Sequence, residues 1–236
     1  VDDVSFTIEK GETLGVVGES GCGKSTLGRT IIHLQEPTDG QIFLNGEDIT
    51  HVKGKELDRI RDKMQIVFQD PYSSLNPRIR IESTIKEPLK HSGRFHGKSE
   101  IQAEADRLME LVGIDERLRQ SYPHELDGGR RQRVGIARAL ALNPEFIVCD
   151  EPVSALDVSI QAQVLNLLMD LQEKMGVAYM FVTHDLSVVR HISNHICVMY
   201  LGQLVEKAPT EELFLHTLHP YTKALLSAIP STDIFH

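Results

Sequence analysis

The sequence predicts an α/β fold in which helices cover a mostly parallel sheet, and three observations lead to this prediction. Short apolar runs of strand length alternate with longer segments of helical periodicity. The pattern G-x-x-x-x-G-K-(S/T), typical of a phosphate-binding loop, stands between one such run and the helical segment after it. Polar or acidic residues follow directly after later apolar runs, where ligands gather in open α/β sheets.

The phosphate-binding loop has the strand and helix context that its motif requires. Residues 13–17 before it predict a buried strand, and residues 27–34 after it predict a helix. The glycines let successive backbone N–H groups face an anion, and the helix dipole favours the same charge. An accidental Gly-rich turn is the alternative, which the flanking strand and helix disfavour. The candidate nucleotide-binding residues are Gly18, Glu19, Ser20, Gly21, Cys22, Gly23, Lys24, Ser25 and Thr26.

Two side chains of this loop have predicted roles. We expect Lys24 to reach the β- and γ-phosphates of a nucleotide, and the Ser25 hydroxyl to ligate Mg²⁺. The loop alone predicts only a nucleoside triphosphatase, so a more specific function depends on the rest of the chain.

The front of the chain predicts strands that are partly antiparallel. Residues 1–8 alternate, with apolar side chains on one face, which favours a half-buried strand. Residues 41–46 predict another strand that ends in an Asn-Gly turn. Residues 64–68 predict a third strand, which ends at Gln69. We interpret Gln69 as a contact for Mg²⁺ or water; the alternative is a surface amide that leaves a strand.

Residues 78–126 predict an inserted helical unit. Ser99 and Gln102 have the spacing of a capping box ahead of an apolar stripe. A second helix is expected over residues 128–142, and the two adjacent glycines at its start indicate a second anion-binding end.

A later apolar run, residues 146–149, ends in two acids. We expect Asp150 to hold Mg²⁺ through water and Glu151 to polarise an attacking water. The alternative is a strand that runs into an acidic turn. Residues 177–183 predict the next buried strand, with His184 at its end. Because parallel strands end at a common edge, we expect Gln69, Asp150, Glu151 and His184 to lie together there.

The remaining segments predict a helix after residues 154–157, a hairpin over residues 196–205 and a short helix over residues 210–218 that covers the sheet edge.

Composition limits the class of protein. The chain has 236 residues, 41% hydrophobic and 25% charged, which is ordinary for one globular domain. Its net charge of −9 argues against a sequence-independent grip on nucleic acid, which needs clustered Lys and Arg. No apolar run has the length of a membrane-spanning helix. Cys22, Cys149 and Cys197 lack C-x-x-C spacing, so free thiols are expected.

Taken together, the motifs resemble those of the nucleotide-binding subunits of ABC transporters, over essentially the whole chain. The resemblance implies a P-loop NTPase with a RecA-like core, an antiparallel β subdomain and an inserted helical subdomain. It also implies ATP and Mg²⁺ as ligands. The matching residues are Gln69 (Q-loop), 126–133 (signature segment), Asp150 and Glu151 (Walker B), 154–157 (D-loop) and His184 (switch histidine).

In that family two subunits meet head to tail, and each ATP lies between one subunit's phosphate loop and the other's signature segment. The resemblance therefore implies contacts to the partner's nucleotide from Asp127, Gly128, Gly129, Arg130 and Asp157. The family usually has Ser and Gln where this chain has Asp127 and Arg130. We expect Asp127 to cap the helix equally well and Arg130 to pair with it.

The resemblance also implies a division of the chain. A single domain spans residues 1–236 and is incomplete at its N-terminus, with the adenine-stacking aromatic expected further upstream. The expected catalytic core and β subdomain comprise residues 1–77 and 143–218, the helical subdomain comprises residues 78–142, and a C-terminal extension starts at residues 219–236.

Three segments, residues 69–78, 153–159 and 219–226, are similar to the oligopeptide and dipeptide importer branch, in its F-type ATP-binding subunit. This similarity implies an ATPase at the cytoplasmic face of a membrane that powers peptide import. The implied partners are two transmembrane permease subunits, a second ATPase subunit and, indirectly, an external solute-binding protein, with no nucleic acid.

Other functions share parts of this pattern. Nickel and glutathione importers have similar motifs, so the solute stays open. DNA-repair and chromosome-organising ATPases insert long coiled coils or DNA-binding modules before the signature, whereas only about a hundred residues without heptads intervene here. A non-catalytic regulatory cassette is disfavoured by the intact Glu151 and His184.

Overall fold

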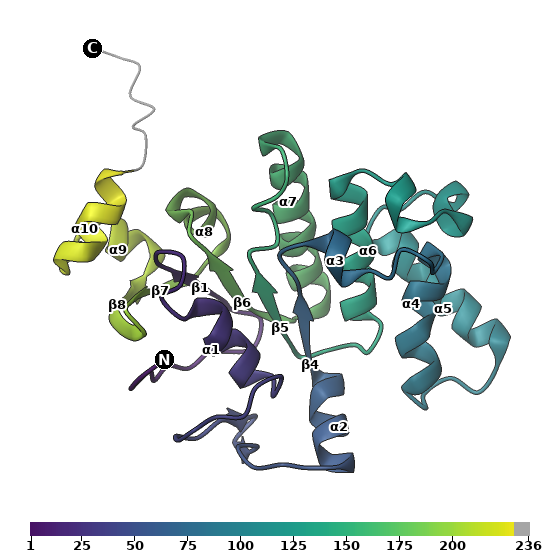
Figure 1. The fold of residues 1–236 in the computed structure, drawn as a ribbon, viewed down its shortest axis with the longest axis horizontal. Coiled ribbons are helices and arrows are strands. Elements are labelled where there is room, and N and C mark those ends of the chain that lie inside the picture. The colour runs from purple at the N-terminus through teal and green to yellow at the C-terminus, as the bar shows by residue number, and fades with distance from the viewer. Residues whose placement is uncertain (229–236) are drawn as a thin grey trace.

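The computed structural model describes residues 1–228, and its main feature is a six-stranded sheet (Figure 1). All neighbouring strands in it are parallel except the antiparallel last pair, β7 and β8. The predicted, mostly parallel sheet is therefore confirmed. In spatial order the strands are β4 (Met64–Val67), β5 (Phe146–Asp150), β6 (Ala178–Thr183), β1 (Thr13–Val17), β7 (His195–Tyr200) and β8 (Gln203–Pro209).

Helices cover both faces of this sheet because alternate strand residues point to opposite sides. In β6, Tyr179 and Phe181 pack into one hydrophobic cluster, together with residues of α7 and α8. Met180 and Val182 pack into the other cluster, together with residues of α1 and α2. The bounds of these helices are α1 (Lys24–Ile31), α2 (Lys55–Lys63), α7 (Val158–Met175) and α8 (Leu186–Ile192).

A helical unit lies between β4 and β5 in sequence and to one side of the sheet in space (Figure 1). This arrangement agrees with the predicted helical insertion. Its elements are α3 (Pro71–Ser74), α4 (Ile81–His91), α5 (Lys98–Leu111), η1 (Glu116–Gln120), η2 (Pro123–Glu125) and α6 (Gly128–Leu140).

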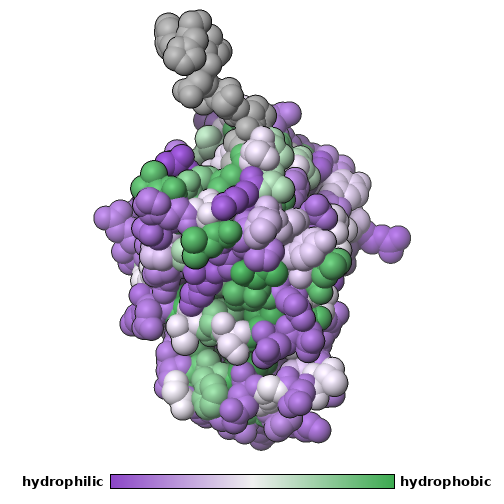
Figure 2. Space-filling model, turned by 90° about the vertical axis from the view of Figure 1, so that its left-hand side faces the viewer, coloured by the Kyte–Doolittle hydropathy of each residue, from purple (hydrophilic) through white to green (hydrophobic). Residues whose placement is uncertain are grey.

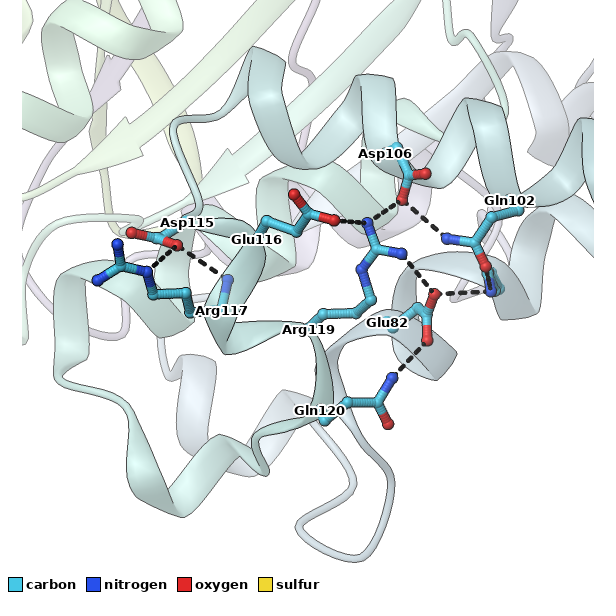
Figure 3. Close-up of polar contacts among 9 residues, drawn as sticks. Glu82, Gln102, Asp106, Asp115, Glu116, Arg117, Arg119 and Gln120 are labelled. Carbon is cyan, nitrogen blue, oxygen red and sulfur yellow. Dashed lines mark hydrogen bonds and ion pairs between the residues drawn. The ribbon is translucent and has the colours of Figure 1, made fainter.

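The predicted capping box at Ser99 and Gln102 is wrong. Helix α5 begins one residue before Ser99, and its N-cap is Gly97, so Ser99 lies inside the first turn. Gln102 instead accepts a hydrogen bond from Lys86 and donates one to Asp106 at 2.8 Å (Figure 3). A polar network between helices thus uses the side chain that the sequence pattern assigned to a cap.

Arg119 is the centre of this network (Figure 3). Its guanidinium lies 2.7 Å from Asp106, 3.1 Å from Glu116 and 3.7 Å from Glu82. These carboxylates belong to α5, η1 and α4, so one cation joins three elements of the helical unit. Arg119 and Glu82 are mostly buried, which strengthens their ion pair relative to an exposed one, whereas Glu116 is largely exposed and its pair with Arg119 is weak.

The strand predicted over residues 1–8 is also wrong. The segment donates one backbone hydrogen bond, from Asp2 N–H to Gly202 O at 2.8 Å, and forms no ladder with another strand. Its apolar face still packs as expected, because Val4, Phe6 and Ile8 lie against the cluster on the α1 side. Alternation thus identified the buried face, but a strand also needs a partner.

The predicted Asn-Gly turn is confirmed. Asn45 and Gly46 have φ values of 52° and 81° and join two short antiparallel strands, β2 (Phe43–Leu44) and β3 (Glu47–Asp48). Positive φ at both central positions fits the hairpin turn that Asn-Gly favours.

The end of the described chain packs beside the antiparallel edge of the sheet. Helix α9 (Thr210–Leu215) contacts β7 and β8, as the sequence predicts for a short helix at this edge. Helix α10 (Pro220–Ser227) follows it. All three cysteines are buried free thiols. Within the described residues, no helix is both long and apolar enough to cross a membrane.

Candidate functional site

The phosphate-binding loop joins β1 to α1, and its backbone requires glycine. Gly23 has a φ of 106° and Gly18 one of 154°, both in the region that L side chains rarely adopt. A Cβ on Gly18 would lie 2.2 Å from the carbonyl oxygen of Met199 and 2.8 Å from the sulfur of Cys22. Packing against the end of β7 and within the loop therefore excludes a side chain at Gly18.

Lys24 places its charge inside this loop. Its side chain is almost fully buried, and its Nζ donates hydrogen bonds to Gly18 O at 2.7 Å and Glu19 O at 2.9 Å. The carbonyl oxygens at the start of the loop thus fix the position of the ammonium group. A buried ammonium beside backbone N–H groups at a helix N-terminus is a site suited to an anion.

Asp150 joins the loop to the end of β5. The Ser25 hydroxyl donates to its Oδ1 at 2.6 Å, and Arg29 Nη2 lies 3.3 Å from its Oδ2. Asp150 itself is 2% exposed. Sequence reasoning placed Ser25 and Asp150 here but missed Arg29. The signal was available, because Arg29 lies four residues after Ser25 and so on the same face of α1.

Glu151 contacts both Gln69 and His184, the other two residues predicted to lie at this edge of the sheet. Its Oε2 accepts a hydrogen bond from Gln69 Nε2 at 3.0 Å and lies 3.4 Å from His184 Nδ1. The ends of β4, β5 and β6 supply these three side chains, so the predicted meeting at one sheet edge is confirmed. Glu151 also has a φ of 47°, an unusual backbone conformation for a residue other than glycine. Such strain concentrates at functional positions.

Helix α6 starts at the signature segment, and Asp127 is its N-cap. Asp127 Oδ1 accepts a hydrogen bond from Arg130 N–H at 2.8 Å, and its Oδ2 lies 3.5 Å from Arg130 Nε. Both the predicted cap and the predicted pairing are therefore present. Each of the two side chains is more than half exposed, so the pairing is weak.

The two glycines of this segment allow close packing on the D-loop side of the molecule. A Cβ on Gly128 would lie 2.9 Å from Leu156 Cδ2, and one on Gly129 would lie 2.5 Å from Ile160 Cγ2. A side chain at Gly129 would therefore clash with Ile160 at the start of α7, whereas one at Gly128 would require the end of the Leu156 side chain to shift. These glycines have a packing role whether or not the helix end meets an anion.

The structure does not bring the signature segment to the phosphate loop of the same chain. Across residues 1–228, none of the hydrogen bonds or ion pairs joins residues 127–130 to residues 18–26. Figure 1 shows α6 beyond β5 and α7, far from α1. Asp157 lies at the N-terminus of α7, on the signature side, and makes no capping hydrogen bond with its side chain.

An ATP-binding cassette with the P-loop NTPase fold is defined by three features. They are the mostly parallel sheet, the phosphate-binding loop whose Ser25 bonds to Asp150 of β5, and the separate helical unit. Profile comparison agrees, because the ABC transporter profile matches residues 1–154. The chain belongs to the ABC transporter family and is an ATP-binding, ATP-hydrolysing subunit. A second profile, the oligopeptide/dipeptide transporter C-terminal region, matches residues 205–234.

Curated relatives place the chain more narrowly within this family. It is 56% identical to the oligopeptide transport ATP-binding protein OppF of Bacillus subtilis (strain 168), over 99% of this chain and 77% of that protein. It is 52% identical to the dipeptide transport ATP-binding protein DppF of Haemophilus influenzae, over 98% of this chain and 70% of that protein.

Solved structures show the same fold. The structure of cbiO1 from Clostridium perfringens, part of the ABC transporter complex cbiONQ, has a TM-score of 0.81 and 27% identity, over 90% of this chain and 83% of that one. A dimeric ATP-binding cassette in a post-hydrolysis state, bound to ADP and Pi, has a TM-score of 0.78 and 32% identity, over 87% of this chain and 88% of that one.

Proposed function

We propose that this chain powers the import of oligopeptides or dipeptides through a membrane ABC transporter. The observation that carries the proposal is the match of residues 205–234 to the C-terminal region of oligopeptide/dipeptide transporters, beyond the shared cassette. Relatives whose names assign peptide transport, such as OppF and DppF, support the same solute class. Nickel and glutathione remain the alternative solutes.

The phosphate loop holds the nucleotide in this proposal. Lys24, whose Nζ lies on the loop carbonyls, reaches the β- and γ-phosphates by turning from those carbonyls to the phosphate oxygens. The backbone N–H groups of residues 18–26 and the start of α1 supply the remaining positive potential.

The residues around Asp150 fit Mg²⁺. Ser25 Oγ and the Asp150 carboxylate are oxygen donors 2.6 Å apart at the end of the phosphate loop, and Mg²⁺ prefers such donors together with phosphate oxygens. We assign Ser25, Asp150 and Gln69 to this ion, with Asp150 acting through water. When bound, Mg²⁺ neutralises negative charge on the phosphate oxygens.

Glu151 polarises the water that attacks the γ-phosphorus. Its carboxylate accepts hydrogen bonds, so it can orient the water and take up the proton that the water loses as its oxygen bonds to the γ-phosphorus and the bond to the leaving ADP breaks. Gln69 and His184 hold this carboxylate from two neighbouring strands. His184 is exposed enough to meet the γ-phosphate side of the site.

The second half of the site comes from a second ATPase subunit. Asp127, Gly128, Gly129, Arg130 and Asp157 lie away from the loop of their own chain, so we assign them to the nucleotide of a partner subunit. The dimeric cassette of similar fold supports this arrangement.

The chain acts at the cytoplasmic face of a membrane beside two permease subunits that receive solute from an external binding protein. We assign residues 1–77 and 143–218 to the catalytic core and β subdomain, residues 78–142 to the helical subdomain and residues 219–236 to the start of a C-terminal extension. The Q-loop region and the helical subdomain are the surface that meets the permeases.

Co-purification and reconstitution test the proposal. The chain is isolated with its membrane subunits and binding protein and placed in proteoliposomes. Di- to pentapeptides are expected to stimulate ATP hydrolysis and to accumulate inside, whereas Ni²⁺ and glutathione are not. Stimulation by Ni²⁺ or glutathione with no response to peptides would reassign the solute, and co-purification with nucleic acid alone would refute a transport role.

A further inference from the structure

The C-terminal helix α10 reaches the phosphate loop directly. The backbone N–H of Glu19 donates a hydrogen bond of 2.9 Å to the hydroxyl oxygen of Tyr221, a residue 202 positions later in the chain. Tyr221 lies in α10 and inside the segment that matches the peptide transporter C-terminal region. A residue of the segment that matches this branch thus contacts the phosphate-binding loop.

Glu19 is held from both sides of its backbone. Tyr221 accepts from its N–H, and Lys24 Nζ donates to its carbonyl oxygen at 2.9 Å. A displacement of Glu19 would therefore move an acceptor that positions the Lys24 ammonium group. Through this single residue, Tyr221 is linked to the cation that meets the phosphates.

The position of Tyr221 is itself fixed. Its ring lies 4.4 Å from the ring of Tyr200, centroid to centroid, at the end of β7. The Glu206 carboxylate of β8 accepts hydrogen bonds from the N–H groups of Leu218 and His219 at 2.8 and 3.1 Å, just before α10. The His219 ring caps α10 by accepting from Tyr221 N–H at 3.2 Å. The hydroxyl is therefore presented by a braced helix.

The loop has a second brace from the same end of the molecule. Gly202 N–H, in the turn between β7 and β8, donates to Cys22 O at 3.0 Å. Figure 2 faces the end that carries β8, α9 and α10, where apolar and polar side chains are intermixed. The β7–β8 turn contacts Cys22 in the middle of the phosphate-binding loop, whereas Tyr221 contacts Glu19 near its start. The two contacts therefore act on different parts of the loop.

We propose that Tyr221 is a positioning residue for ATP, which holds Glu19 and thereby lets the C-terminal region set the nucleotide affinity of the loop. The inference rests on the loop binding nucleotide and is independent of which solute is transported. Loss of the hydroxyl would leave the ring contact with Tyr200 in place, so its effect can be isolated from that of packing.

The test compares Tyr221→Phe with Tyr200→Phe in the intact chain. The Tyr200 hydroxyl makes none of the hydrogen bonds described for residues 1–228, so its removal is a matched control. Tyr221→Phe is expected to raise the KM for ATP and the Kd for ADP by about two- to fivefold, the lower part of the range for one hydrogen bond because water can reach Glu19. The kcat is expected to stay within about twofold.

Hydrogen exchange gives a readout that needs no nucleotide. The amides of residues 18–24 are expected to exchange faster in Tyr221→Phe than in the wild type or in Tyr200→Phe. Equal KM, Kd and exchange in both variants would overturn the proposal. A lower melting temperature of Tyr221→Phe with unchanged KM and loop exchange would also overturn it, since that result would indicate a purely structural contact.

Discussion

The Ser25 hydroxyl donates a 2.6 Å hydrogen bond to the Asp150 carboxylate, which joins the phosphate loop to the end of β5. The two residues are 125 positions apart, and both are oxygen donors of the kind that Mg²⁺ prefers. The Nη2 atom of Arg29 lies 3.3 Å from the other oxygen of this carboxylate, Oδ2. The carboxylate assigned to the metal therefore already has a cationic neighbour.

This neighbour gives the first prediction. Arg29→Gln removes a positive charge beside Asp150, so the Mg²⁺ concentration that supports half-maximal nucleotide binding is expected to fall by about two- to fivefold, the scale of a half-exposed ion pair. A fluorescent ATP analogue titrated at fixed Mg²⁺ concentrations measures it. Arg29→Lys, which keeps the charge, is the control. A higher Mg²⁺ requirement in Arg29→Gln would mean instead that Arg29 aligns Asp150.

The second prediction concerns the altered signature. A carboxylate about 4 Å from a phosphate charge costs about 4 kcal/mol at an effective dielectric constant near 20, before screening. Arg130 lies close enough to Asp127 to cancel part of this repulsion, but both side chains are more than half exposed. We therefore expect weak ATP-driven homodimerisation, and a better fit beside a different ATPase subunit.

Sedimentation of the Glu151→Gln protein with ATP measures this effect. The same protein with Asp127→Ser and Arg130→Gln is expected to dimerise more tightly, and its helix is expected to stay capped because Ser is also a good N-cap. Equal dimerisation of the two proteins would show that Asp127 only caps α6 and that the dimer tolerates it.

The third prediction is a pH dependence at the base of α10. Burial alone would raise the pKa of Glu206, but hydrogen bonds to its carboxylate, among them those from Leu218 and His219 N–H, outweigh this and hold the pKa below its ordinary value of 4.5. A lowered pKa in the folded state means that the carboxylate stabilises the fold fully above pH 4.5, and that this contribution is lost as the pH falls through the folded pKa.

Thermal unfolding of the wild type and Glu206→Gln from pH 3 to 7 tests this dependence. The wild type is expected to have the higher melting temperature near neutral pH, and the difference is expected to shrink steadily below pH 4.5. A difference that does not vary with pH would show that the charge of Glu206 contributes nothing.

The sequence predicted the structure correctly where neighbouring residues alone determine the local conformation. The loop glycines, the buried runs of β5 and β6, and the polar residues that end them placed Gln69, Glu151 and His184 at one edge. It failed where a contact depended on distant residues. Residues 1–8 have strand alternation but no pairing strand, and Gln102 bonds with α4 rather than with its own helix end.

Two contacts, one at Asp150 and one at the phosphate-binding loop, were missed for related reasons. Arg29 was visible as a neighbour of Ser25 on one helix face, yet only the fold shows that Asp150 lies opposite. Tyr221 stands in a segment that signals its family branch, and no local pattern indicates that its hydroxyl meets Glu19. Long-range hydrogen bonds of this kind are set by the packing of whole elements.

The fourth prediction addresses the central claim, that Glu151 polarises the water that hydrolyses ATP. In Glu151→Gln the amide keeps the size of the side chain and can still bond with Gln69, but it cannot accept a proton from the attacking water. ATP binding is therefore expected to persist while turnover falls at least about a hundredfold, within the range for general base catalysis. Lys24→Ala is the contrasting control, in which ATP binding itself is expected to weaken.

The most direct measurement is phosphate release by purified Glu151→Gln and wild-type protein under saturating Mg-ATP, with ATP binding determined by equilibrium titration of the same samples. The account predicts tight binding by both proteins and phosphate release by the wild type alone. Phosphate release by Glu151→Gln at the wild-type rate would contradict the assignment of Glu151 and, with it, the proposed site.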